Sequence, residues 1–168
     1  MSKNKRCFLV VGGQSSGTRM MVRSLILSGV PEIKIPLDTE YAYGKLPPLP
    51  EGDFALHRGM PIGGVWTHLW SMSKRLRHEG FAVIPIVMTR DWNATAQSQV
   101  RRGYVNDVEQ AVAQLRAAYI QITQSLEGYV FVSYEQYCLS SAYRRILFEG
   151  WGLPESPIDI HEANSQYY

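Results

Sequence analysis

A glycine-rich segment between an apolar run and an amphipathic run constrains the fold of this chain more than any other feature. Residues 12–19 read Gly-Gly-Gln-Ser-Ser-Gly-Thr-Arg and follow the apolar run 6–11 directly. Residues 18–28 then place apolar side chains at helical spacing and end before Gly29. The segment predicts a buried strand, a tight loop and a helix, an arrangement whose backbone N–H groups can bind an anion.

The rest of the chain alternates short apolar runs with amphipathic runs. Further strands are expected at 33–36, 54–57, 82–89 and 129–133, and helices at 65–77, 93–102, 108–126 and 139–150. Such alternation predicts an α/β fold, a three-layer α/β/α arrangement around a mostly parallel sheet. A length of 168 residues suffices for one such domain, so we expect a single domain over 1–168 with an irregular tail at 155–168.

Charge and cysteine content exclude several classes of protein. No run of eighteen apolar residues occurs, so no membrane span is expected. The two cysteines could form only one disulfide bond, which is not the pattern of a secreted, disulfide-rich protein. A cytoplasmic protein is therefore expected. The net charge of +2 argues against a nucleic-acid partner, and no His, Asp or Glu spacing suits a metal. The first thirty residues hold five basic residues and no acidic one, which favours an anionic ligand at that end.

The spacing from Gly12 to Gly17 equals that of the P-loop of nucleotide-binding enzymes. A P-loop kinase has Lys at the next position, where this chain has Thr18, and the change weakens that interpretation. Asp91 follows an apolar strand, as a magnesium-binding acid would in such a kinase. A nucleotide or small-molecule kinase remains an alternative, and so does a plain glycine-rich turn without a ligand.

The sequence Ser16-Gly17-Thr18-Arg19 resembles the loop of the sulfotransferases that use 3′-phosphoadenosine 5′-phosphosulfate (PAPS). The resemblance implies a P-loop-type α/β fold and PAPS as the cofactor. It also implies that the loop binds the 5′-phosphosulfate through Gly13, Gln14, Ser15, Ser16, Gly17 and Thr18. The family usually has Lys or Arg where this chain has Ser15, and Arg19 is the candidate substitute for that charge.

A second segment resembles the same family independently. Thr89-Arg90-Asp91 follows the apolar run 82–89, and Ser98 lies eight residues beyond Arg90. In the family an Arg and a Ser at this spacing hold the 3′-phosphate of the cofactor, and the resemblance implies that role for Arg90 and Ser98. Arg101 and Arg102 are further candidates for the 3′-phosphate, because the usual C-terminal basic motif is not found. A solvated helix face is the alternative for these two residues.

His57 is the candidate catalytic base because it closes the expected strand 54–57, at the sheet edge where the loop should lie. Many family members have a base at this point in the chain order, and a structural His that ends a strand is the alternative. The resemblance implies sulfuryl transfer to a hydroxyl or amine of a small-molecule or carbohydrate acceptor. A non-catalytic nucleotide-binding module on the same fold is the remaining alternative.

Overall fold

Five strands and six α-helices alternate along the described residues of a computed structural model, which are 5–35, 45–62, 64–156 and 164–167. The strands are β1 (Arg6–Gly13), β2 (Glu32–Ile33), β3 (Phe54–Met60), β4 (Ala82–Thr89) and β5 (Val130–Ser133). The helices are α1 (Thr18–Leu27), α3 (Leu69–His78), α4 (Trp92–Arg101), α5 (Val108–Ser125), α6 (Tyr134–Leu139) and α7 (Ser141–Gly150), followed by the 3₁₀ helix η1 (Asn164–Tyr167).

All the strand pairs are parallel, and the strand order is β2-β3-β1-β4-β5. The chain leaves β1 toward the β3 side of the sheet, whereas it leaves β4 toward β5. Two neighbouring strands whose connections diverge open a crevice at their carboxyl ends, where α/β proteins bind ligands. A ligand site is therefore expected beside the loops that follow β1 and β4.

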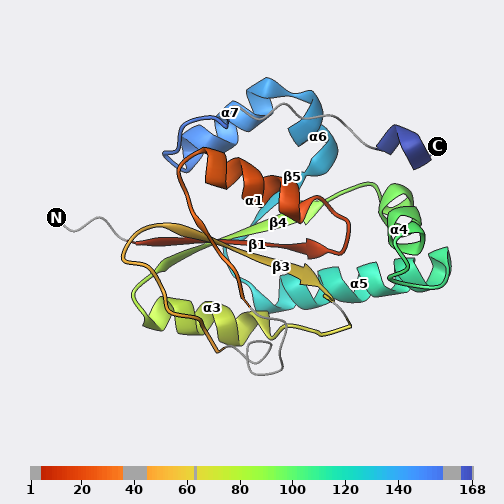
Figure 1. Cartoon of the computed structure of the whole chain (residues 1–168), viewed down its shortest axis with the longest axis horizontal. Helices are drawn as coiled ribbons and strands as arrows, with labels where there is room; N and C mark the ends of the chain where they lie inside the picture. The colour runs from red at the N-terminus through yellow and green to blue at the C-terminus, as the bar shows by residue number, and fades with distance from the viewer. Residues whose placement is uncertain (1–4, 36–44, 63, 157–163, 168) are drawn as a thin grey trace.

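Helices cover both faces of the sheet, as Figure 1 shows, with α1, α6 and α7 on one face and α3 and α5 on the other. Alternate residues of β1 supply the two cores. Cys7, Leu9 and Val11 pack with α3 and α5, while Phe8 and Val10 pack with α1, α6 and α7. Because both faces are buried, the strand needs a continuous apolar sequence. The expected three-layer α/β arrangement is confirmed, and the sheet is parallel throughout the described residues.

Two strands differ from their expected bounds by three residues at one end, whereas β1 and β5 differ by two residues or one. β3 continues to Met60, three residues beyond the expected end at His57, because Arg58, Gly59 and Met60 pair with the last residues of β1. β2 is limited to Glu32–Ile33, where it pairs with Ala55 and Leu56, and Pro36 lies outside the described residues. Strand pairing, which local sequence does not encode, decides both bounds.

The expected helix 139–150 corresponds to α7, which begins at Ser141, and a separate short helix, α6, ends at Leu139 just before it. Ser133 caps α6 by accepting a hydrogen bond from the N–H of Gln136, and Ser140 caps α7 in the same way with Tyr143. Ser140 has extended dihedrals, so the chain bends between the two helices. Serine side chains favour such N-terminal positions because they satisfy the unpaired N–H groups of the first turn.

The expected helix 65–77 begins later, at Leu69, because Val65 forms a short antiparallel bridge with Ile62. The tail expected to be irregular contains a described 3₁₀ helix, η1, at Asn164–Tyr167. Contacts between η1 and α4 place this part of the tail beside the carboxyl end of the sheet. The first difference arises from a local bridge between Ile62 and Val65, and the second from contacts between segments distant in sequence.

Candidate functional site

The loop between β1 and α1 is a tight turn. The N–H of Ser16 donates to the carbonyl of Gly13 at 3.1 Å, and Ser15 and Gly17 have positive φ angles of 67° and 94°. A Cβ on Gly12 would lie 2.4 Å from Ser16 Oγ, and one on Gly17 would lie 2.7 Å from Tyr134 Cδ2. Glycine is therefore required at both positions by close packing of the loop.

The loop opens the N-terminus of α1 toward solvent. Among the described residues, no side chain caps α1 and no acidic residue lies in its first turn. The described residues also accept no hydrogen bond from the N–H groups of Thr18 and Arg19. Unsatisfied N–H groups and the helix dipole together favour an anion at this point.

Arg90 leaves the carboxyl end of β4 and reaches this loop. Its Nη1 donates to the carbonyl of Ser15 at 3.0 Å, and its Nε donates to Asn164 Oδ1 at 2.6 Å. Its guanidinium also lies 4.6 Å from the centre of the Tyr134 ring. The side chain is buried yet borders the cavity described next, so the two segments singled out in the sequence meet in the fold.

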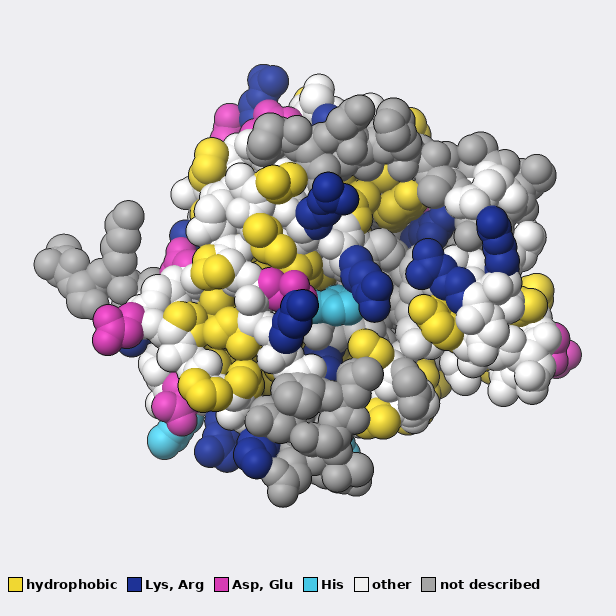
Figure 2. Space-filling view, viewed as in Figure 1, with side chains coloured by type: hydrophobic (Ala, Val, Ile, Leu, Met, Phe, Trp, Pro, Cys, Tyr) yellow, Lys and Arg dark blue, Asp and Glu magenta, His cyan; other side chains and the backbone are white. Residues whose placement is uncertain are grey.

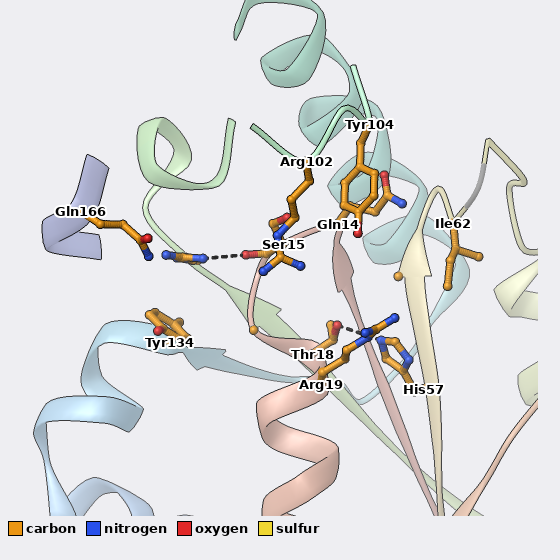
Figure 3. A pocket seen from close by; sticks show the side chains of 13 residues that line it. Gln14, Ser15, Thr18, Arg19, His57, Ile62, Arg102, Tyr104, Tyr134 and Gln166 are labelled. Carbon is orange, nitrogen blue, oxygen red and sulfur yellow. Dashed lines mark hydrogen bonds between the residues drawn. The ribbon is translucent and has the colours of Figure 1, made fainter. Parts of the chain in front are cut away.

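A cavity of about 260 Å³ lies between the loop, β3 and the segment after α4 (Figure 3). Its size is near the lower end of the range for small-molecule sites. Three of its walls carry guanidinium groups, those of Arg19, Arg90 and Arg102, and no Asp or Glu is among the described residues that line it. In Figure 3 the side chain of Arg102 points toward Ser15. The cavity is therefore strongly cationic and suits an anion.

His57 borders the same cavity from β3, where it lies opposite Val10 of β1. Its Nε2 is 2.9 Å from Oγ1 of Thr18, the first residue of α1. Burial and, to a lesser extent, the positive charges of Arg19 and Arg58 together lower the pKa of His57 to about 4. The imidazole is neutral near pH 7, so one ring nitrogen can accept a proton. His57 lies within β3 and not at its end, which corrects the expected position.

The cavity brings together most of the residues singled out in the sequence. Its lining includes Gln14, Ser15, Gly17, Thr18, Arg19, His57 and Arg90. Gly13 and Ser16 belong to the loop but are buried, and they do not line the cavity. Ser98 does not line it either, because its side chain points into the buried side of α4, where Ser98 Oγ has no hydrogen-bond partner among the described residues.

Several lining residues were not assigned to the site from the sequence. They are Gly59, Ile62, Tyr104, Tyr134 and Gln166. Tyr134 directly follows β5, a position at the same sheet edge that could have been recognised once the strand order was known. Gln166 comes from η1 and carried no signal in the sequence. Arg102, one of the two alternatives for the 3′-phosphate, lines the cavity, whereas Arg101 donates to Gln166 at 2.8 Å.

The remaining acidic and metal-binding candidates have structural roles. Asp91 caps α4 by accepting a hydrogen bond from the N–H of Ala94 at 2.8 Å. Glu135 accepts from the Asp91 N–H, from Asn164 and from Ser133. Burial alone would raise the pKa of Glu135, but these hydrogen bonds outweigh it and lower the pKa. Among the described residues no group of His, Cys, Asp and Glu could hold a metal ion.

Two further findings bear on the class of protein. None of the described helices has the length and apolar character needed to cross a membrane. No known protein family matches the chain, and no curated protein is significantly similar to it.

Proposed function

We propose that this protein binds PAPS in the cationic cavity and transfers its sulfuryl group to a hydroxyl or amine of a small molecule or carbohydrate. One observation carries the proposal. The guanidinium of Arg90, from the end of β4, lies 3.0 Å from the loop after β1, on a cavity with three arginines and no described acidic residue. A ligand with two phosphorylated ends suits this cavity, because several arginines can form charge-assisted hydrogen bonds with its phosphates.

The residues present fit an anionic donor in two respects. The turn at residues 13–17 leaves no room for a Cβ at Gly12 or Gly17, as expected of a cradle shaped by backbone. Ser15, Thr18 and Arg19 line the same cavity, and no described residue accepts from the N–H groups of Thr18 and Arg19, so a phosphosulfate there would meet donors and a positive helix dipole. In this proposal the loop holds the 5′ end, while Arg90 and Arg102 hold the 3′-phosphate.

When bound, the donor supplies a sulfuryl group whose sulfur–oxygen bond to the 5′-phosphate breaks as a bond to the acceptor oxygen forms, releasing adenosine 3′,5′-bisphosphate. His57 takes the proton that the acceptor hydroxyl loses. Its low pKa keeps it neutral before the reaction, and an anion in the cavity offsets the charges of Arg19 and Arg58 that depress this pKa. Arg19 faces the same space and balances negative charge on the moving group.

A non-catalytic binding module is the second candidate, and Ser15 favours it. The family that the loop resembles has a cation at this position, whereas Ser15 Oγ is buried and has no hydrogen-bond partner among the described residues. If Arg19 cannot replace that cation, the cavity retains binding without transfer. A kinase is less favoured, because Thr18 replaces the phosphate-binding Lys and Asp91 is engaged as a helix cap.

Thermal unfolding with added nucleotides tests the binding step. Adenosine 3′,5′-bisphosphate at about one hundred times its Kd should raise the midpoint by roughly 5–10 °C, since this concentration stabilises the native state by about 2.7 kcal/mol. ATP with magnesium should have a smaller effect. The R102Q variant should bind the bisphosphate about 10- to 100-fold more weakly, because it loses a charge-assisted hydrogen bond.

The matched control is R116Q, which changes an exposed arginine on α5 outside this cavity. It should bind as the unchanged chain does. A larger shift with ATP and magnesium than with the bisphosphate would overturn the proposal in favour of a kinase. Binding without any sulfated product from a panel of hydroxyl and amine acceptors would select the non-catalytic module.

A further inference from the structure

A second cavity, of about 450 Å³, adjoins the first and lies between α1 and the strands β2 and β3. Three residues border both cavities, namely Arg19, His57 and Ile62. A molecule in the second cavity can therefore lie against His57 without entering the first cavity. This is the position from which an acceptor can be deprotonated while a donor occupies the first cavity.

Among the described residues, the charge of the second cavity is unbalanced. Four of the described lining residues are cationic and one, Glu32, is a carboxylate; the cations are Arg19, Arg23, Lys34 and Arg58. None of Arg19, Arg23 and Lys34 forms an ion pair with a carboxylate of the described residues. In Figure 2 several Lys and Arg side chains surround a histidine near the centre of this face. Arg19, Arg23 and Lys34 surround a hollow and are not neutralised by an ion pair with a described carboxylate, which favours an anionic ligand.

The remaining lining of this cavity is apolar. It consists of Val22 and Ile26 from α1, Ile33 and Ile35 from the β2 region, and Ile62 after β3. Aliphatic side chains on the walls and cations around them suit a ligand with an apolar body and a charged end. A fully polar anion, such as a free sugar phosphate, would leave these side chains without apolar contacts.

We propose that the second cavity binds the acceptor, and that this acceptor is a hydroxyl- or amine-bearing carboxylate with an apolar body. The role of this ligand as an acceptor rests on the proposed sulfuryl transfer. The preference for an apolar carboxylate rests on the second cavity alone. The carboxylate lies against Arg23 and Lys34, the body lies on the isoleucines, and the hydroxyl faces His57. Transfer forms the bond from the hydroxyl oxygen to sulfur as the bond from sulfur to the 5′-phosphate oxygen of PAPS breaks, which releases adenosine 3′,5′-bisphosphate, and the hydroxyl proton passes to the imidazole.

Direct binding tests the preference without any nucleotide. Three hydroxy acids are compared with their uncharged amides by titration calorimetry on the full chain: 3-(4-hydroxyphenyl)propanoate, 4-hydroxycyclohexylacetate and 8-hydroxyoctanoate. At least one acid should bind about tenfold or more tightly than its amide, since one charge-assisted hydrogen bond contributes that much. The R23Q and K34Q variants should remove most of this difference. Both residues are exposed, so the fold should tolerate the changes, and R116Q should bind as the unchanged chain does.

Transfer from PAPS to the same acids and amides separates the two proposals. If an acid binds through Arg23 and Lys34 but no product forms, the second cavity's preference for a carboxylate is supported and the proposed sulfuryl transfer is refuted. If acids and amides are sulfated equally well, transfer stands and the preference for a carboxylate is refuted. The preference is equally refuted if, across all three pairs, no acid binds more tightly than its amide.

Discussion

Replacement of Gly17 by alanine tests the packing of the anion-binding loop. Gly17 has φ +94°, and a Cβ added there would lie 2.7 Å from Tyr134 Cδ2. The left-handed backbone costs an L residue roughly 1–2 kcal/mol. Tyr134 is buried and packs against the guanidinium of Arg90, so its ring cannot move away freely. Overpacking of this kind adds about 1–3 kcal/mol. G17A should therefore lower the free energy of unfolding by about 2–5 kcal/mol.

Gly29, just after the other end of α1, provides a matched control. Its φ is +89°, and no atom lies within 4 Å of an added Cβ. G29A should carry the backbone cost alone, about 1–2 kcal/mol. Urea unfolding followed by tryptophan fluorescence gives both values on the same scale.

A double-mutant cycle isolates the contact with the ring. In a Y134A background the added methyl group meets no ring, so G17A should cost about as much as G29A. Equal destabilisation by G17A and G29A in the unchanged background would refute the close approach of Tyr134 to the loop. A cost of G17A that persists unchanged in the Y134A background would refute it as well.

Three other predictions concern stability and reactivity. The native pKa of His57 is about 4, below the usual 6.5, so the unfolded chain gains a proton first as the pH falls. The free energy of unfolding should therefore drop by about 2 kcal/mol between about pH 7 and pH 5. An H57Q variant that shows the same drop would contradict this prediction. D53N should lower stability by about 1 kcal/mol in urea unfolding, because Asp53 accepts hydrogen bonds from the backbone and the guanidinium of Arg6; no loss at low salt would refute the pairing. Burial raises the pKa of Cys7 far above its usual value, so maleimide should label this thiol only after unfolding, as mass spectrometry would show; rapid labelling of the native chain would exclude a buried Cys7.

The sequence by itself determined the class of the fold and the two segments that matter most for the site. The apolar run before Gly12 had to be a buried strand, because so many adjacent apolar residues need cover on both faces. The glycines and Thr18 marked the turn into a helix, and Arg90 directly after β4 marked the same sheet edge. Each of these signals depends only on residues that are close together in the chain, so the local sequence is enough to predict it.

Only the tertiary structure decided which side chains share the cavity. Ser98 follows Arg90 by eight residues, yet the rotation of α4 buries its hydroxyl and Arg102 lines the cavity instead. η1, from the far end of the chain, supplies Asn164 to Arg90, and the extension of β3 sets His57 beside Thr18. These positions depend on strand pairing and helix packing between distant segments. The free energy of such a contact depends on the residues of both segments. The sequence of either segment alone therefore does not predict the contact.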